Sequence, residues 1–558
     1  MKIKKLISLM LSSIIVLSSV CMAASADETD RTGFVHADGR DVIGTDGEKL
    51  LIKGMALGNS VWSNPSVPNY QHHTEATYKE LSEMGFNSVR FYINYGLFEN
   101  DRNPYSYNEK GFKWIDKNIK WAKKYGMGII LNMHYPQGGF QSQGNGMELW
   151  TKKSNQKRLI KLWSAIADRY SDEPTVWGYG LINEPYVPLK SNMEETAQQY
   201  FDFTEELVSA IRKVSPEQAI FVECLCNARD IEGNNKSPDW SWFVPENKFP
   251  EIDDDNIIYE FHCYDPFYFT HQNADWASTG GITSSYPSDM IASADYIESW
   301  SGCIRGKRKI TDKDWAYFET DMAALSVKQN TAIAALHAPS TGRGSVYFDD
   351  VSVIEISPDG KRNIKYSYDF DSGISDFSAW SYDGTGEMRY SNEGRNNSGC
   401  IEITGSQSDY VASAQRFEMK KGYKYMVSGY IRTENSESEP SVRLDFALAK
   451  NIKYFDRDYL EGIISSYADF SEKRNVPLYM GEFGVIAAGF DKGRNGEEWV
   501  ADMIELCMEY DIGFNYHAYH EESFGFYQNR SDRPVSKKNT ALEKVFYDKL
   551  SDKKTTDE

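Results

Sequence analysis

The chain repeats one pattern, in which an apolar run of strand length is followed by an amphipathic stretch of helix length. Strands that alternate with helices at this spacing pair in parallel, so the repeat predicts a parallel sheet. Six units come first, and two more follow a long interruption. Their apolar runs span residues 51–58, 88–93, 128–134, 176–184, 219–224, 256–264, 478–483 and 513–519. Eight units predict an α/β fold that closes into a (β/α)8 TIM barrel.

The interruption, residues 304–450, differs in character from the units around it. Short runs that alternate apolar and polar residues, such as 345–354 and 423–432, are bounded there by Gly, Asn, Asp and Ser. This pattern is typical of an all-β sandwich. We therefore expect a second domain inserted between barrel strands six and seven, with residues 27–303 and 451–558 forming the barrel. The alternative, two separate barrels or a β-domain that divides two half-folds, would leave six and two units unable to close a sheet.

The first residues have the three parts of a secretory signal peptide. Lysines within residues 1–5 precede an apolar stretch at 6–20 and the small residues Ala24-Ser25-Ala26. We expect residues 1–26 to be removed and the mature chain to be secreted and extracellular. No other stretch approaches the roughly 20 apolar residues that span a membrane, so no membrane partner is expected.

The net charge of the chain and the spacing of its cysteines argue against several classes of ligand. The formal net charge is −21 at pH 7, and such an acidic surface repels nucleic acid and anionic membranes but tolerates a neutral polymer. Cys224 and Cys226 are too close in sequence for the usual zinc site, and no second pair accompanies them. We therefore expect no metal in the active site and no other cofactor.

Two glutamates stand at the ends of apolar runs that lie far apart in the sequence, in Asn183-Glu184-Pro185 and Gly481-Glu482-Phe483-Gly484. Because a proline disfavours a helical backbone at the residue before it, we expect the chain to stay extended at Glu184 and the carboxyl to project from a strand end. A glutamate at a strand end can also be structural, in a salt bridge at a sheet edge. Two of them at one end of a barrel favour instead a pair that cleaves a glycosidic bond.

Other polar residues follow the same pattern. Each lies at the carboxyl end of a predicted strand, the face where barrel enzymes place their active sites: Arg90, His134, Asn183, His262 and Tyr264. For any one of them alone, a capping group or a polar group satisfied in the core is the simpler interpretation. Their coincidence at one face predicts a single site around the two glutamates.

With these segments the chain resembles glycoside hydrolase family 5 over most of residues 33–303 and 451–550. The matching pieces are Asn87-Ser-Val-Arg90, Leu131-Asn-Met-His134, Leu181-Ile-Asn-Glu-Pro185, His262-Cys-Tyr264 and Gly481-Glu-Phe-Gly484. The resemblance implies a retaining endo-β-1,4-glycanase that hydrolyses plant cell-wall polysaccharide, in the first place an endoglucanase (cellulase). A β-mannanase and a mixed-linkage β-glucanase are the alternatives within the family. A non-catalytic glycan-binding protein is disfavoured, because it would not need both glutamates.

The resemblance also implies a role for each residue. Glu482 would be the nucleophile and Glu184 the general acid/base, so one carboxyl must be ionised while the other keeps its proton. Arg90 would hold Glu482 anionic, and Tyr264 would donate a hydrogen bond to it.

Three further residues would contact the substrate. Asn183 would bind the sugar 2-hydroxyl, an interaction that strengthens at the oxocarbenium-like transition state, and His134 and His262 would orient the substrate and the carboxylates. One departure from the family concerns the tryptophan that usually lies under the sugar after the eighth strand. This chain has no tryptophan there, and Tyr516 or His517 is expected in its place.

The insertion resembles jelly-roll carbohydrate-binding modules, but in a changed order. Residues 315–351 contain segments that resemble the closing strands of such modules, whereas residues 368–433 contain segments that resemble the opening strands. We infer a circular permutation in which Ser357-Pro-Asp-Gly360 joins the old ends.

Two functions are open for this insertion. Four aromatic residues are candidates for binding glycan, with a place in the sandwich core as the alternative: Trp380, Tyr382, Tyr410 and Tyr430. Asp349-Asp350 is a candidate site for a structural Ca2+, as in similar modules. Overall we expect a monomer whose partner is a β-linked polysaccharide.

Overall fold

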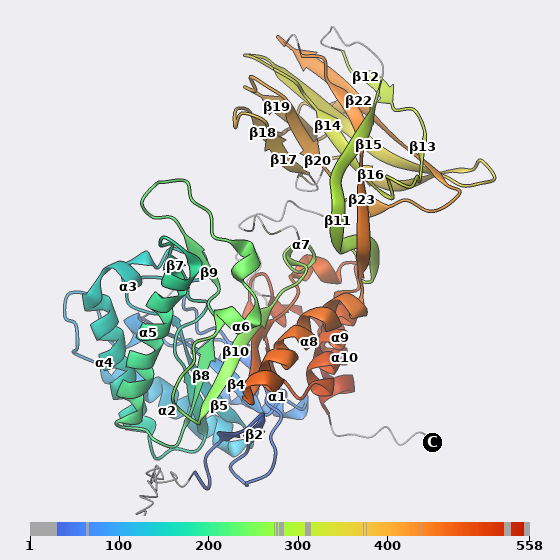
Figure 1. Cartoon of the computed structure of the whole chain (residues 1–558). Coiled ribbons are helices and arrows are strands. Elements are labelled where there is room, and N and C mark those ends of the chain that lie inside the picture. Colours follow the sequence, from blue (N-terminus) through green and yellow to red (C-terminus); the bar gives the residue numbers. More distant parts are fainter. Residues whose placement is uncertain are drawn as a thin grey trace, which may run out of the picture.

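The computed structural model of the chain describes residues 31–62, 66–272, 274, 277, 284–306, 314–371, 373–374, 377–436, 438–528 and 537–551. The expected signal peptide, residues 1–26, lies outside these ranges. Figure 1 shows a barrel ringed by helices and a sheet-rich unit joined to it by two long strands. Within the described part of the chain, no helix is long and apolar enough to cross a membrane.

Parallel strands of the described chain close into an eight-stranded barrel, in which each strand pairs with the next in chain order and the last pairs with the first. The strands are β3 (Lys53–Leu57), β4 (Ser88–Asn94), β5 (Gly128–Tyr135), β6 (Val176–Gly180), β8 (Ala219–Glu223), β10 (Ile257–Cys263), β24 (Leu478–Phe483) and β25 (Gly513–Tyr516). Each overlaps its predicted apolar run. The predicted α/β TIM barrel is confirmed.

Helices surround the barrel (Figure 1). The longer ones are α1 (Glu75–Glu83), α2 (Glu109–Lys124), α4 (Lys153–Tyr170), α5 (Met193–Arg212), α8 (Arg457–Arg474), α9 (Gly496–Glu509) and α10 (Thr540–Leu550). Helix α8 was not predicted, and it separates the insertion from β24. Its first turn is capped by Asp456, whose carboxylate accepts from the Tyr459 amide, and it ends at Asn475 in the left-handed conformation. The insertion therefore occupies the loop between β10 and its helix, at the carboxyl ends of the strands.

Shorter elements complete the barrel unit. They are β1 (His36–Asp38), β2 (Asp41–Ile43), β7 (Tyr186–Pro188), β9 (Asn227–Arg229), β26 (His520–Glu521), β27 (Tyr527–Gln528), β28 (Lys537–Lys538), α3 (Met147–Thr151), α6 (Pro245–Lys248) and α7 (Phe267–Thr270). Short 3-10 turns lie at Tyr95–Leu97, Trp240–Trp242 and Ala487–Phe490.

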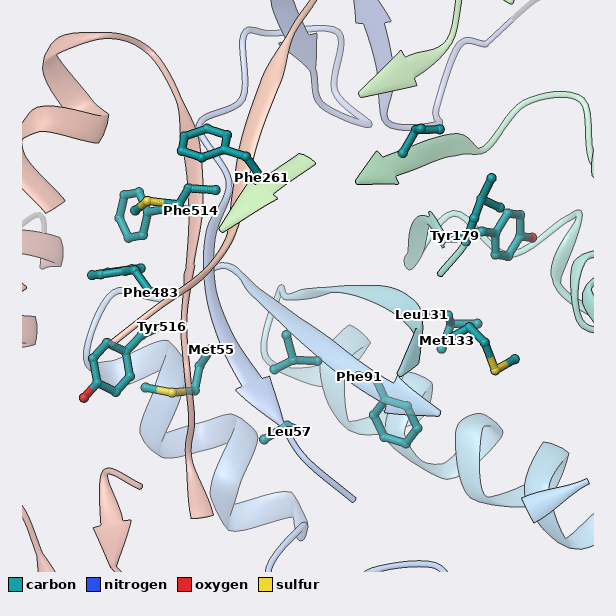
Figure 2. Close-up of a cluster of buried hydrophobic side chains, with 14 of the residues drawn as sticks. Met55, Leu57, Phe91, Leu131, Met133, Tyr179, Phe261, Phe483, Phe514 and Tyr516 are labelled. Atoms are coloured by element: carbon teal, nitrogen blue, oxygen red, sulfur yellow. The ribbon is translucent and has the colours of Figure 1, made fainter. Parts of the chain in front are cut away.

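Alternation along the strands separates the apolar core from the polar interior. Successive side chains of a strand point to opposite faces, so Phe91 points outward while Arg90 and Tyr92 point inward. Figure 2 shows outward side chains of this kind, including Phe91, Phe483 and Tyr516, in the buried layer between the strands and the helices. The inward set is thereby left free to form a polar site.

The described residues of the insertion form two packed antiparallel sheets. One contains β11 (Ser288–Arg305), β14 (Thr331–His337), β17 (Ser378–Ser381), β20 (Tyr410–Ser413), β21 (Phe417–Glu418) and β23 (Ser441–Phe455). The other contains β12 (Ala316–Glu319), β13 (Ala323–Ala324), β15 (Ser345–Ile356), β16 (Arg362–Tyr368), β18 (Glu387–Ser391), β19 (Cys400–Thr404) and β22 (Lys424–Glu434). Ser357–Gly360, the expected junction of the permuted ends, forms the turn between β15 and β16.

Strands β11 and β23 connect the sandwich to the barrel as one antiparallel pair (Figure 1). Ser288 pairs with Phe455 at the barrel end, and Arg305 pairs with Arg443 within the sandwich. The expected domain limits, residues 304 and 450, fall inside these strands. Side chains in the middle of β11 are exposed, so this stretch lacks the buried alternation by which a sandwich strand is found in sequence.

The candidate ligand residues of the insertion differ in environment. Trp380 and Tyr382 are exposed, whereas Tyr410 is buried in the sandwich core and the Arg395 guanidinium covers the Tyr430 ring at 3.3 Å. The Asp349 carboxylate accepts hydrogen bonds from the amides of Asp350 and Arg395 and from the Ser398 hydroxyl. The Arg395 guanidinium pairs with the Asp350 carboxylate, so both aspartates are already engaged by protein donors.

We predict that the insertion folds alone. A fragment of residues 286–456 should show β-rich circular dichroism and unfold cooperatively in urea, because its core is complete without the barrel. Phe348→Ala, in that core, should lower the free energy of unfolding by about 3–5 kcal/mol. Tyr382→Ala, at an exposed aromatic, should change it by no more than about 0.5 kcal/mol. A disordered fragment would show that the sandwich depends on the barrel.

Candidate active site

The two expected glutamates lie together at the carboxyl ends of the barrel strands. Glu184 follows β6, and Glu482 is in β24. One carboxylate oxygen of each, together with a ring nitrogen of His262, lie within 4.8 Å of one another. The Glu184 side chain is 18% exposed and that of Glu482 only 6%, so the two carboxyls have different solvation.

The backbone at Glu184 is not extended as expected. Its φ angle is 43°, in the left-handed region, and its amide donates to Glu223 Oε2 at 2.9 Å. The proline that follows disfavours only the right-handed helical conformation strongly, and the buried Glu223 carboxylate fixes the amide. The chain thus turns at Glu184 instead of continuing the strand.

Glu482 accepts hydrogen bonds on both oxygens. Arg90 Nη1 and the Tyr92 hydroxyl donate to Oε1 at 2.6 and 2.7 Å, and the Tyr264 hydroxyl donates to Oε2 at 2.9 Å. Burial alone would raise the pKa of Glu482, but interactions with His262, His517 and Arg90 outweigh it and lower this pKa well below its usual range. Glu482 is therefore ionised at neutral pH.

Arg90 is fully buried and compensates more than one acid. Besides Glu482, its Nη2 donates to Asn183 Oδ1 at 3.0 Å and lies 2.7 Å from Glu260 Oε1. The glycine before Glu482 makes room for this arrangement, because a Cβ at Gly481 would lie 1.8 Å from Glu260 Oε1.

His262 links the acids on both sides of the site. Its Nδ1 lies 2.9 Å from Glu184 Oε1, and its Nε2 lies 3.4 Å from Glu223 and 3.5 Å from Glu260. Burial opposes protonation of the ring, but the carboxylates of Glu223 and Glu482 and the contact with Glu184 raise the pKa of His262 well above its usual value. An imidazolium here donates to Glu184.

His134 differs from His262 in its protonation. Burial lowers the pKa of His134 well below its usual value. Its ring stacks on Tyr92, with centroids 3.9 Å apart and planes inclined by 13°, and its Nδ1 lies 3.2 Å from Asn132 Oδ1.

Of the two residues expected in place of the tryptophan, only His517 reaches the site. Its Nδ1 lies 2.9 Å from the Tyr92 hydroxyl. Tyr516 is fully buried on the opposite face of β25, on the same side as Phe483 (Figure 2). Its ring packs edge-on against Phe483 and Phe546. The prediction that Tyr516 lines the site is wrong. Neighbouring side chains of a strand point to opposite faces, so Tyr516 and His517 cannot both point into the barrel.

Comparison with known proteins identifies the barrel. Residues 42–317 match the family model Cellulase (glycosyl hydrolase family 5). The barrel belongs to glycosyl hydrolase family 5. The resemblance found in the sequence is thus confirmed, and β24 and β25, beyond the matched range, close the same barrel.

Curated relatives are similar to this family 5 chain over part of their length. Endoglucanase C of Acetivibrio thermocellus is 30% identical over 230 residues, which are 40% of this chain and 61% of that protein. Cellodextrinase A of Ruminococcus flavefaciens is 28% identical over 231 residues, 40% of this chain and 62% of that protein. An endoglucanase of Paenibacillus polymyxa is 26% identical over 290 residues, 47% of this chain and 70% of that protein. The chain therefore spans about three fifths of the first two relatives.

The family 5 site contains four residues that sequence reasoning missed: Trp62, Tyr92, Glu223 and Glu260. Three of them had a signal in strand periodicity. Tyr92 lies two residues after Arg90 on the same strand, Glu260 two before His262, and Glu223 ends the fifth barrel strand.

Trp62 had no such signal, since it lies in the loop after β3. The residue is 42% exposed, and its ring stands edge-on to Tyr92, His134 and His517, with interplanar angles of 86–90°. The loop after the first barrel strand thus places an aromatic ring beside the two carboxylates, whereas the family usually places its tryptophan after the eighth strand.

We predict that Arg90→Met lowers the free energy of unfolding of the family 5 barrel by about 3–5 kcal/mol at pH 7, because the buried carboxylates of Glu260 and Glu482 lose their closest cation. The loss should shrink in acid, since protonation neutralises the stranded carboxylates. Urea unfolding at several pH values measures both effects. Arg169→Met, which breaks the more exposed pair with Asp116, should cost no more than about 1 kcal/mol. A penalty for Arg90→Met that does not change with pH would contradict this account.

Proposed function

We propose that this chain is a retaining endo-β-1,4-glucanase. The observation that carries the proposal is the spacing of the two glutamates, whose nearest oxygens lie within 4.8 Å of each other. Retaining glycosidases place their carboxyl groups about 5–5.5 Å apart, whereas inverting enzymes need about 6.5–9.5 Å to admit a water molecule. The space between Glu184 and Glu482 fits direct attack on the sugar.

In the proposed reaction Glu482 attacks the anomeric carbon, and Glu184 gives its proton to the leaving oxygen. Water then attacks the glycosyl-enzyme ester while Glu184 takes a proton from it. The ionised state of Glu482 supports its role as nucleophile. Two carboxyl groups and water complete this cycle, so the proposal calls for no metal or other cofactor.

The neighbouring residues support this division of roles. Asn183 accepts from Arg90 through Oδ1 and donates one amide hydrogen to the Ser142 hydroxyl at 3.3 Å, which leaves its second amide hydrogen to donate to the sugar 2-hydroxyl. His262 contacts Glu184 directly and would stabilise the carboxylate that forms when the proton leaves. Tyr264 and Arg90 hold the attacking carboxylate in place.

A β-linked glucan is the proposed substrate. Two of the relatives above are named endoglucanases, and a net charge of −21 suits a neutral polymer better than nucleic acid or an anionic membrane. A β-mannan and a mixed-linkage β-glucan are the alternatives. We further propose that the protein is secreted, on the basis of the signal-like residues 1–26, and that it acts as a monomer.

We predict that Glu482→Ala and Glu184→Ala each reduce hydrolysis of carboxymethylcellulose at least about 100-fold without loss of fold. Azide should restore turnover of an activated aryl glycoside, with a β-glycosyl azide formed by Glu184→Ala and an α-glycosyl azide by Glu482→Ala. Glu251→Ala, at an exposed side chain, is the control and should remain fully active. If NMR showed that the first product of the native enzyme has the α configuration, the retaining mechanism would be wrong.

We also predict that Trp62→Ala raises KM for cello-oligosaccharides about 3- to 10-fold, because a sugar ring would lose its stacking partner. Its kcat should change less, since the Trp62 ring lies edge-on against other aromatic rings of the site and carries no group that transfers a proton or attacks the sugar. Trp300→Ala, at a similarly exposed tryptophan of β11, should leave KM unchanged. Equal KM values for the native protein and Trp62→Ala would remove Trp62 from the substrate-binding surface.

A further inference from the structure

A row of three aromatic rings lies beside Glu482 in this site. The Tyr92 ring is nearly parallel to His134 on one side and to His517 on the other, with interplanar angles of 13° and 17°. The Tyr92 hydroxyl lies 2.7 Å from Glu482 Oε1 and 2.9 Å from His517 Nδ1. Tyr92 is fully buried and His517 is 7% exposed, so water contributes little to these contacts.

The short contacts determine where the protons lie. Glu482 is ionised and can only accept, and burial followed by interaction with Glu482 raises the pKa of Tyr92 well above its usual value, so the phenol keeps its single proton. If Tyr92 donated to His517, its lone pairs would face a carboxylate oxygen at 2.7 Å. The arrangement that satisfies both contacts has Tyr92 donating to Glu482 and His517 Nδ1–H donating to Tyr92.

We propose that His517 and Tyr92 form a chain of two hydrogen bonds that positions the nucleophile Glu482 and favours its ionised form. His517 acts through Tyr92, so both are positioning residues. His517 directly follows β25 and Tyr92 lies in β4, so this hydrogen-bond chain uses the position after the eighth strand where the family usually has a tryptophan. This inference rests on the proposed function, since it names Glu482 as the nucleophile.

Other donors act on the same carboxylate, so the contribution of the chain is partial. The charged and titratable groups around Glu482 are Arg90, Tyr92, His134, Glu184, His262, Tyr264 and His517. His517 itself also interacts with His271. Loss of one hydrogen bond to Glu482 should therefore make its ionised form less stable, while the remaining donors still keep part of that stabilisation.

The test compares variants that keep the rings but change the donors. Tyr92→Phe retains the stacking on His134 but removes the hydroxyl, and it should lower kcat/KM on an activated aryl cellobioside about 10- to 100-fold. The acid limb of its pH profile should move to higher pH, because an anion with fewer donors gains a proton more readily. His517→Leu should move both quantities in the same direction. His517→Asn keeps an N–H near the position of Nδ1 and should restore most of the activity.

Two further measurements separate positioning from packing. Tyr516→Phe, at a neighbouring buried tyrosine that does not contact the carboxylates, should behave as the native protein. In the native protein with 15N-labelled histidine, NMR should show His517 protonated at Nδ1. Thermal unfolding of every variant checks that the barrel is intact.

The outcomes separate this inference from the proposed function. A native protein that neither hydrolyses β-glucan nor is labelled at Glu482 by a 2-fluoro glycoside would overturn the proposed function, while the NMR signal would still report the tautomer. An active native enzyme with His517 protonated only at Nε2, or with equal losses in His517→Leu and His517→Asn, would overturn the chain. An unchanged acid limb in Tyr92→Phe would also overturn it.

Discussion

The buried guanidinium of Arg90 connects side chains from several strands of the barrel. It comes from β4 and contacts Asn183 after β6, Glu260 in β10 and Glu482 in β24. A fully buried cation has a large desolvation cost unless it is paired and hydrogen-bonded. The buried carboxylates that pair with Arg90 would have a similar cost if Arg90 were absent. The site is therefore stable only when strands from both parts of the chain are in place. Catalytic geometry and barrel closure depend on the same contacts.

The barrel could be predicted because its strands are buried on both faces and therefore read as continuous apolar runs. The residues at their carboxyl ends could be predicted for the same reason, since the end of each run marks the catalytic face. Tyr516 was misplaced because a run of this kind does not show which side chains point inward. Tyr92 and Glu260 were missed although two-residue spacing from Arg90 and His262 placed them on the same face. Helix α8 was missed because it follows β23 of the insertion and not a barrel strand, so it did not fit the repeat of barrel strand and helix.

Loop residues were the least accessible to sequence reasoning. Trp62 follows β3 in a segment without periodicity, and its position depends on contacts with His134 and Tyr92, residues distant in sequence. The left-handed backbone at Glu184 likewise depends on Glu223, a residue on another strand. Such features arise from tertiary contacts that no local pattern records. They also lie closest to the expected substrate, which is why the fold was easier to predict than the sugar.

The pairing of Ser288 with Phe455 has a consequence for the order of folding. Before the insertion folds, the chain must close the whole loop between Cys263 and Leu478 to bring β24 beside β10. Once β11 and β23 have paired, the ends of the insertion are adjacent, and the remaining loop is several-fold shorter. The entropic free-energy cost of closing the loop between β10 and β24 then falls by about 1–2 kcal/mol. A sandwich that folds early would thus serve as a short connection between the sixth and seventh barrel strands. Once β24 and β25 have been synthesised, they could then pair with the six barrel strands that precede the insertion.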